Sequence, residues 1–403
     1  DHAGTIKELD QINRSLVLRK GFSKQKKQLP RTLSIGEKVM EHSRFENLNK
    51  NIYNFCDNLL ENKKGYDALK SFLNRDIPNI KGIKSGDKII VPTVCWSTSV
   101  WPILQNNLVP VFVDINQNTL NADIDKIQAL LETDSSIKAI MAVHILGNST
   151  NMNRLMELKE KHNLLLIEDT CESLGSTYNN KFLGTFGECG TFSFYFSHHI
   201  TTIEGGMIVC NDYNIYNILK CLRAHGWTRD VDLSLYEDCK DITLNDRFCF
   251  INLGYNLRPM ETQAAMGIVQ LTKLSVQNEN RIKNYNRIKA CIESYQSDKL
   301  SFFTAEENCN CIWFSLPLLL NKKYDKTQYM KRLFDKGIDS RPIVTGNFTN
   351  QPVFKYLNIP GTQDSAYYKN SENIDKHGFF IGLHSISLFD IKFIFSNNSF
   401  VFL

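Results

Sequence analysis

Residues 88–115 read KIIVPTVCWSTSVWPILQNNLVPVFVDI, and they show the clearest alternation of strand and helix patterns in the chain. Two short runs rich in Val and Ile, at 88–92 and 109–114, flank an amphipathic stretch at 98–107. Short apolar, β-branched runs are typical of buried strands, and a helix between two such runs forms a βαβ unit. The stretch therefore predicts two parallel strands joined by a helix.

The same alternation continues beyond this unit. It predicts strands at 138–144, 163–169, 191–196 and 206–210, and helices at 124–132, 152–162, 213–224, 261–274 and 277–295. A sheet of this kind is covered by helices on both faces and places its chemistry at the carboxyl ends of its strands. The apolar run at 311–320 and the helix pattern at 325–337 indicate a smaller α+β domain. We expect a divergent segment at 1–85, a large α/β domain at 86–297 and a small domain at 298–403.

Composition excludes several classes of protein. The 403 residues carry 47 basic and 43 acidic side chains, a net charge of +4 with no dense basic stripe, which argues against nucleic acid as a partner. No apolar run approaches the roughly 18 residues that a membrane-spanning helix needs. The 11 cysteines are scattered along the chain, which indicates reduced thiols and not a disulfide framework. We therefore expect a cytoplasmic protein that contacts neither nucleic acid nor membrane.

Two carboxylates stand at the end of an apolar strand. Asp169 closes the run NLLLIED, and Glu172 follows three positions later. A buried carboxylate is costly without a cation or a protonated nitrogen nearby, so this position implies a ligand. The alternative, in which Asp169 caps the next helix, has about even weight on this motif alone.

A polar loop, SHHITTIEGG at 197–206, lies between two predicted strands and contains His198 and His199. A histidine there is a candidate general base, although a solvated or core histidine is the commoner case. Adjacent side chains on an extended segment point oppositely, so at most one of the two faces a site. We expect no metal, because zinc lacks further ligands at suitable spacing, and Cys309 with Cys311 supplies only two.

Other candidates carry weaker signals. Trp96, directly after a predicted strand, suits stacking on a planar ligand or simple coverage of the sheet. Arg258 offers a fork for phosphate beside the polar Asn256, and Arg229 adds positive charge beyond a helix. Each is equally compatible with an ordinary turn or surface position.

Several motifs together resemble the DegT-type (DegT/DnrJ/EryC1/StrS) sugar aminotransferase family over about 86–384. They are VPTVCWSTSVWP, LLLIEDTCESLGS, GTFSFYFSHHITTIEGGMIV, CLRAHGWTRD, GYNLRPMETQAAMGIVQL and GIDSRPIVTGNFTNQPVFKYL. The chain is most similar to the dehydratase branch, because His198 stands where ordinary members carry a Schiff-base lysine. The resemblance implies a fold type I transferase, with a mainly parallel, seven-stranded-type sheet and a small C-terminal domain, acting as a homodimer.

The resemblance also implies pyridoxal 5'-phosphate (PLP) or pyridoxamine 5'-phosphate (PMP) as cofactor. Trp96 would then stack on the cofactor ring, Asp169 would pair with the pyridine nitrogen and Glu172 would lie near the ring oxygen. Ser193 would bind the cofactor phosphate, and Asn256 would reach it from the partner subunit. The resemblance further implies that three arginines hold the substrate: Arg229, Arg258 and Arg341.

The replacement of lysine by histidine determines the implied reaction. An imidazole forms no stable Schiff base but moves protons, so His198 would be the catalytic residue. The implied reaction is C3 dehydration of a nucleotide-linked 4-keto-6-deoxyhexose, with GDP-4-keto-6-deoxymannose expected, in dideoxysugar and O-antigen synthesis. Glutamate would regenerate PMP. A conventional sugar aminotransferase and a catalytically impaired sugar-nucleotide-binding relative remain as alternatives.

The chain departs from the family pattern before the first predicted strand. Residues 58–72 lack the Ser- and Gly-containing loop that holds the cofactor phosphate in the family. Either the 63–65 stretch, Lys-Lys-Gly, replaces this loop or cofactor binding is impaired. An iron–sulfur relative has clustered cysteines where this chain has only Cys239 and Cys249, so we expect no iron–sulfur cluster.

Overall fold

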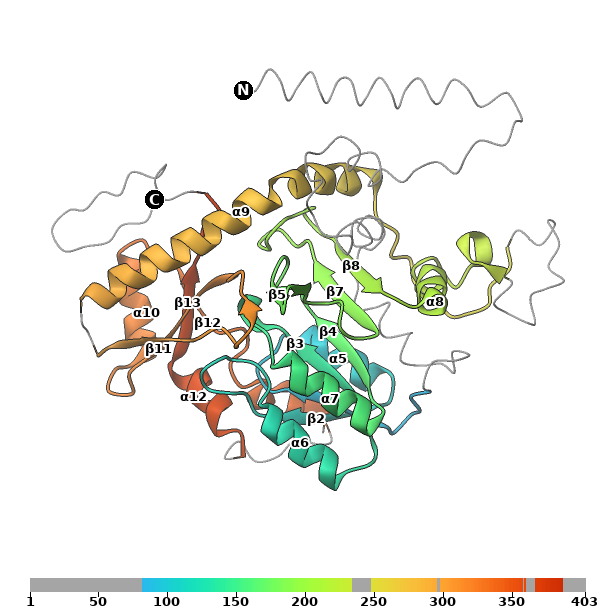
Figure 1. Ribbon diagram of the computed structural model, residues 1–403, viewed down its shortest axis with the longest axis horizontal. Helices are drawn as coiled ribbons and strands as arrows, with labels where there is room; N and C mark the ends of the chain where they lie inside the picture. Colours follow the sequence, from blue (N-terminus) through green and yellow to red (C-terminus); the bar gives the residue numbers. More distant parts are fainter. Residues whose placement is uncertain (1–81, 234–247, 296–297, 358, 360–366, 387–403) are drawn as a thin grey trace, which may run out of the picture.

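The computed structural model describes residues 82–233, 248–295, 298–357, 359 and 367–386 (Figure 1). The predicted segment 1–85 therefore lies almost entirely outside the described residues. The 58–72 stretch with its Lys-Lys-Gly sequence, and Cys239, lie outside them as well.

A central sheet contains six strands within the described residues, in the order β2-β1-β3-β4-β7-β8. Neighbouring strands are parallel except for β7 and β8, which are antiparallel. The strands are β1 (Lys88–Pro92), β2 (Val109–Val113), β3 (Ile137–Val143), β4 (Leu165–Asp169), β7 (Cys189–Ser193) and β8 (Gly206–Cys210). The six predicted strands are thus confirmed to within a few residues at their ends.

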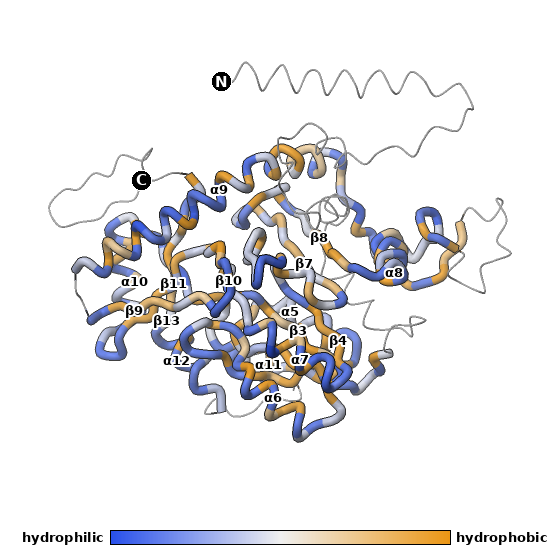
Figure 2. The backbone as a smooth tube through the Cα atoms, in the orientation of Figure 1, coloured by the Kyte–Doolittle hydropathy of each residue, from blue (hydrophilic) through white to orange (hydrophobic). Residues whose placement is uncertain are grey.

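Helices cover both faces of this sheet because its strands are apolar on both sides. Ile89 and Val91 of β1 belong to one buried cluster, whereas Ile90 belongs to the other. The helices are α5 (Ser97–Gln105), α6 (Ile124–Thr133), α7 (Met152–His162) and α8 (Tyr213–Arg223). Helices α6 and α7 pack on the face of Ile90, and α5 and α8 pack on the opposite face. In Figure 2 orange is concentrated on the central strands, whereas the helices around them show both orange and blue.

A single long helix, α9 (Glu261–Ser294), follows the central sheet. The prediction of two helices, at 261–274 and 277–295, was wrong in placing a break between them. Residues 275 and 276 are Ser and Val, and neither Gly nor Pro interrupts the backbone hydrogen bonds there. The helix runs across the molecule and reaches the C-terminal part of the chain (Figure 1).

The C-terminal part is built on a four-stranded antiparallel sheet in the order β12-β13-β11-β9. Its strands are β9 (Leu300–Phe302), β11 (Ser315–Leu320), β12 (Ser340–Pro342) and β13 (Gly378–Gly382), with helices α10 (Lys326–Asp335), α11 (Val353–Leu357) and α12 (Lys369–His377). The remaining short elements are η1 (Ile145–Gly147), β5 (Thr177–Tyr178), β6 (Lys181–Phe182), η2 (Thr228–Asp230), β10 (Cys309–Asn310) and η5 (Phe348–Asn350). The domain boundaries at 85 and 298 stay predictions.

Strand β2 and helix α12 are joined by a buried carboxylate. Asp114 accepts hydrogen bonds from the backbone N–H of Asn370 at 3.1 Å and of Ser371 at 2.9 Å, and Lys126 lies 2.8 Å from Oδ2. Tyr368, at the N-cap of α12, makes no capping bond with its own side chain, so Asp114 caps that helix through bonds that span 256 and 257 positions of sequence.

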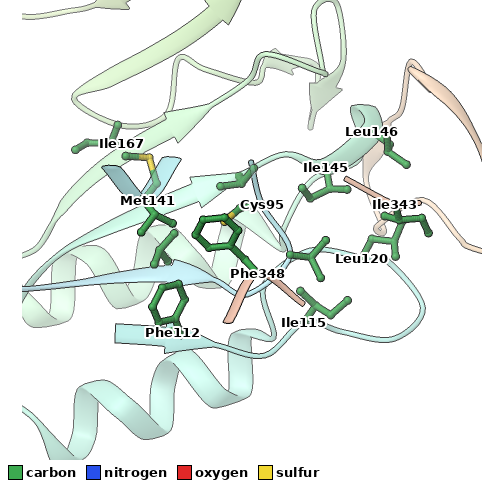
Figure 3. Close-up of a cluster of buried hydrophobic side chains, with 14 of the residues drawn as sticks. Cys95, Phe112, Ile115, Leu120, Met141, Ile145, Leu146, Ile167, Ile343 and Phe348 are labelled. Atoms are coloured by element: carbon green, nitrogen blue, oxygen red, sulfur yellow. The ribbon is translucent and has the colours of Figure 1, made fainter. Parts of the chain in front are cut away.

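Apolar side chains close the same junction. Phe348, from the C-terminal part, lies among Cys95, Phe112 and Met141 of the central sheet region (Figure 3). The backbone N–H of Phe348 also donates to the carbonyl of Thr93 at 2.8 Å. This contact fixes the C-terminal part against the loop that carries Trp96.

Candidate active site

Four predicted site residues gather at the carboxyl edge of the central sheet. Asp169 ends β4, Ser193 ends β7, and Trp96 follows β1 as the N-cap residue of α5. His198 lies in the loop between β7 and β8, which returns to the same edge. Because parallel strands end together, residues far apart in sequence meet here.

Asp169 is the most buried member, with 4% of its surface exposed. Ser99 donates its hydroxyl to Oδ2 at 2.7 Å, and the backbone N–H of Cys171 reaches Oδ1 at 3.2 Å. These bonds orient the carboxylate and stabilise its charge. The capping alternative is not what the structure contains, since no helix begins at Asp169.

His198 is held in one tautomer by its backbone partner. Its Nδ1 lies 2.6 Å from the carbonyl oxygen of Cys171. A carbonyl only accepts, so Nδ1 carries the proton and the neutral ring has its lone pair on Nε2. Burial lowers the pKa of His198, while the Cys171 carbonyl and the charge of Asp169 act in the opposite direction. The half-buried ring is therefore a neutral imidazole suited to accept a proton at Nε2.

His199 has a different environment from its neighbour. It is buried, and its Nε2 donates to the carbonyl of Ile312 at 3.3 Å. Burial holds the pKa of His199 well below its usual range. The prediction that at most one of the two histidines faces a site agrees with this arrangement.

Glu172 lies next to Asp169 and takes its hydrogen bond from an unusual turn. Its Oε2 accepts the backbone N–H of Leu146 at 2.8 Å. Leu146 adopts a left-handed conformation, with φ 52°, that a buried leucine rarely has. Burial raises the pKa of Glu172 to about 7, and the charge of Asp169 adds to the effect. Glu172 thus exchanges a proton in the neutral range.

Trp96 presents an unusual helix start. Its side chain is 57% exposed, and it provides no side-chain cap for α5, in contrast to the Asp and Asn caps of α6, α7 and α8. Exposure of a large indole at a sheet edge suits stacking on a planar ligand.

Ser193 lies at the end of β7, two positions beyond the residue Thr191 that pairs with Asp169 in the sheet. Its hydroxyl accepts the backbone N–H of Tyr195 at 3.2 Å.

Three of the predicted residues lie on the β8 side of the sheet, beside the end of α8. Asn256 pairs with Ala224 in an isolated antiparallel bridge, and Arg258 lies 3.3 Å from Asn256 Oδ1 and 3.4 Å from His225 Nε2. Arg229 stacks on Trp227 with its guanidinium carbon 5.3 Å from the ring centroid. We call this surface the basic aromatic strip; it consists of His225, Trp227, Arg229, Phe248, Phe250, Asn256 and Arg258.

The rings of the basic aromatic strip are stacked and open. Phe248 lies 5.6 Å from Trp227 at an interplanar angle of 14°, and it is 75% exposed. Phe250 pairs with Trp227 in a bridge and is also exposed. Arg341 is separate from the strip: it lies on β12 in the C-terminal sheet, exposed and 3.7 Å from Asp339.

A second buried carboxylate supports the site from beneath. Glu168, fully buried, accepts the backbone N–H groups of Gly184, Phe186 and Gly187 at 2.7–2.8 Å and contacts His144 Nε2 at 3.1 Å. The backbone N–H of His144 in turn donates to the carbonyl of Asp169 at 3.0 Å. This network fixes the end of β4, where Asp169 stands.

Several residues that shape the site were not among those predicted from the sequence. Ser99 follows Trp96 by three positions, a spacing that places both on one side of a helix start, and this signal was available. The N–H of Leu146, and Phe314, whose ring lies 5.3 Å from His198, had no local signal. Among the residues that the structure describes, no group of three or more His, Cys, Asp or Glu is placed to hold a metal ion.

The sheet, the long connecting helix and the site at the strand ends define a fold type I pyridoxal-phosphate-dependent transferase. The chain belongs to the DegT/DnrJ/EryC1/StrS aminotransferase family, whose match spans residues 63–387. Across the described ranges, no helix is long and apolar enough to cross a membrane.

Within this family, the chain is similar over most of its length to several individual proteins. The chain is 40% identical to the GDP-4-keto-6-deoxy-D-mannose 3-dehydratase of Yersinia pseudotuberculosis over 78% of this chain and 79% of that protein. It superimposes on the Escherichia coli GDP-4-keto-6-deoxy-D-mannose-3-dehydratase with bound hydrated PLP at a TM-score of 0.71 and 38% identity, covering 82% of this chain and 84% of that one. A structure of GDP-4-keto-6-deoxymannose-3-dehydratase with a trapped PLP-glutamate geminal diamine matches equally, over 82% and 85%.

Proposed function

We propose that this protein is a PLP- and PMP-dependent 3-dehydratase of a nucleotide-linked 4-keto-6-deoxyhexose. The substrate would be GDP-4-keto-6-deoxymannose, and glutamate would restore the amine form of the cofactor. The names of its similar relatives support this activity. The observation that carries it is His198, a residue unable to form a stable Schiff base, held by Cys171 with its Nε2 free to accept a proton.

The residues at the sheet edge fit the cofactor. Asp169, a buried carboxylate oriented by Ser99, suits a protonated pyridine nitrogen, and the exposed indole of Trp96 suits the ring face. Ser193 would hold the phosphate. Bound there, the cofactor supplies an electron sink and an amine that condenses with the sugar ketone.

His198 would perform the proton transfers of the dehydration. In the neutral ring, Nε2 would be the atom that takes up the proton released beside the bound cofactor. The resulting imidazolium then donates that proton to the departing C3 hydroxyl, which leaves as water. The hydrogen bond from Nδ1 to the Cys171 carbonyl remains in both protonation states, so the ring keeps its orientation throughout.

Glu172 would assist at the cofactor ring oxygen. Its pKa of about 7 lets it hold a proton at neutral pH, and a protonated carboxyl donates a hydrogen bond where a carboxylate only accepts. The N–H of Leu146 keeps one carboxyl oxygen fixed, which leaves the other oxygen for this contact.

The basic aromatic strip would bind the nucleotide part of the substrate. Arg229 and Arg258 offer cations for a diphosphate, and the exposed rings of Phe248 and Phe250 offer stacking faces for a base. The strip lies two strands away from Asp169, which supports a homodimer in which it serves the partner's site. Asn256 would then reach the partner's cofactor phosphate.

Arg341 would contact the sugar or its phosphates from the C-terminal sheet. Its side chain is exposed and its ion pair with Asp339 is long, so little restrains it from turning toward a ligand. We further propose that the protein works in the cytoplasm, in dideoxysugar and O-antigen synthesis. The nine free cysteines of the described residues fit a reducing compartment.

The test uses the purified full chain. PMP is titrated first, followed by incubation with glutamate and GDP-4-keto-6-deoxymannose and mass spectrometry of the product. A ketone that lacks the C3 oxygen supports the dehydratase. Retention of that oxygen with gain of an amino group identifies a conventional aminotransferase instead. Absence of saturable PMP binding identifies a catalytically impaired relative.

A further inference from the structure

Arg281 is a buried cation on α9, with 7% of its surface exposed. Its Nη1 donates to the carbonyls of Phe314 and Leu383, both at 2.9 Å. Within the described ranges no carboxylate forms an ion pair with it, and its Nε–H has no hydrogen-bond partner. A buried charge without a counter-ion destabilises a fold, so its presence calls for a functional reason.

The segment 312–314 lies between this cation and the histidine pair. The carbonyl of Phe314 accepts from Arg281, while the Phe314 ring lies 5.3 Å from His198 and 5.7 Å from His199. Two positions earlier, the carbonyl of Ile312 accepts from His199. The guanidinium and both imidazoles therefore contact the same residue, Phe314, and the guanidinium itself is buried, where water screens a charge less than at the surface.

Charges of opposite sign reach His198 from the elements packed around it. Asp169, at the end of β4, favours the protonated ring, and the carbonyl of Cys171 accepts from Nδ1. Burial disfavours the protonated ring most strongly, and the charge of Arg281, from α9, acts in the same direction. On its own segment, His198 is followed by the neutral His199, and Tyr195 lies 6.1 Å away ring to ring.

We propose that Arg281 is a positioning residue whose buried charge, held beside Phe314, adds to the effect of burial in keeping the His198 ring neutral, so that Nε2 is available as a base. Without it, burial alone would oppose the effect of the Asp169 carboxylate and the Cys171 carbonyl on His198. The inference rests on the proposed role of His198. Arg281 touches neither substrate nor cofactor in this assignment and acts through the histidine.

A purely architectural role is the competing explanation, since Arg281 also ties α9 to residues 314 and 383. Two variants separate the roles. Arg281→Gln keeps an N–H donor for a carbonyl but removes the charge, whereas Arg281→Lys keeps the charge. Arg287→Met, an exposed arginine on the same helix, is the matched control.

The measurement is the His198 ring titration by NMR in the cofactor-free protein, assigned with His198→Asn. We expect Arg281→Gln to raise the pKa of His198 by about half a unit or more, and Arg281→Lys and Arg287→Met to leave it near the native value. The acidic limb of single-turnover dehydration should move to higher pH by the same amount in Arg281→Gln alone.

Two results would overturn the inference. One is a folded Arg281→Gln protein with an unchanged His198 titration. The other needs no variant: a wild-type His198 that titrates at or above the ordinary histidine value of about 6.5. Because the titration uses cofactor-free protein, either result is distinct from a failure of the dehydratase assignment, which the product analysis reports.

Discussion

The hydroxyl of Ser99 donates a 2.7 Å hydrogen bond to Oδ2 of Asp169, joining helix α5 to the end of β4 across 70 positions of sequence. Ser99 is fully buried, so this bond is made away from competing water. It orients the carboxylate that we assign to the cofactor nitrogen.

Replacing Ser99 with Ala should weaken PMP binding. A hydrogen bond to a charged group contributes about 1.5–3 kcal/mol, so a rise in Kd of roughly tenfold or more is expected. The measurement is an absorbance titration of the apoprotein with PMP. Ser97→Ala, at the first position of the same helix, is the control. An unchanged Kd in Ser99→Ala would show that the bond does not support the cofactor.

Replacing His198 with Asn should remove the base while keeping a side chain of similar polarity. We expect single-turnover dehydration to fall by about 10²- to 10⁴-fold, the usual contribution of a general base, with PMP affinity little changed. His162→Asn, at the end of α7, serves as the control and should keep full activity. If His198→Asn retained most of the rate, His198 would not be the general base.

Replacing Glu172 with Gln should change the pH dependence of stability. A carboxyl whose pKa rises to about 7 on folding is unfavourable when ionised, so its cost is absent below its unfolded pKa of about 4.3 and complete above about 7. Glu172→Gln should therefore gain stability over wild type at pH 8 relative to pH 5, by thermal unfolding. Exposed Glu157→Gln should show no such gain, and equal gains in both variants would contradict the assignment.

Replacing Asp114 with Asn should destabilise the fold by about 1.5–3 kcal/mol at pH 7, because the first turn of α12 loses its charged acceptor, while Lys126 is exposed enough to turn to water. Burial raises the pKa of Asp114, but the hydrogen bonds from Lys126 and Ser371 outweigh it and lower the pKa overall. The stabilisation is present above the unfolded pKa of about 3.9 and is lost as the pH falls through the folded value.

The difference in the free energy of unfolding between wild type and Asp114→Asn should consequently decrease as the pH falls below about 4. Urea unfolding at a series of pH values measures it. Asp335→Asn, exposed at the end of α10, is the control at pH 7 and below pH 4. A gap that stays constant down to pH 2 would argue that the ionised form of Asp114 is not what caps α12.

Replacing Gly147 with Ala should be far more damaging than the same change at Gly86. Both glycines have positive φ, 98° and 91°, which costs an alanine about 1–2 kcal/mol. At Gly147 the new Cβ also meets the carbonyl oxygen of Ile312 at 2.2 Å, whereas at Gly86 it meets open space. Since that carbonyl holds His199, Gly147→Ala should lower both stability and activity, by thermal unfolding and turnover. Equal losses in both variants would exclude the clash.

The features predicted from the sequence are those that depend on residues close together in the chain. The period of the apolar residues located all six strands of the central sheet, and a polar loop between two strands pointed to His198. The break inside α9 was wrong because its amphipathic pattern is weak and no Gly or Pro at 275–276 ends the helix there. Ser99 and Arg281 gain their roles from Asp169 and Phe314, residues that only the folded chain brings near.

The cap that Asp114 provides for α12 has a consequence for recombination between relatives. A crossover placed anywhere between 114 and 370 parts the carboxylate from the helix terminus that it completes. A chimaera then keeps its cap only if the parent that supplies the N-terminal segment carries an acidic residue directly after β2. Exchange of C-terminal segments within the family is therefore restricted by one side chain that belongs, in sequence, to the other half.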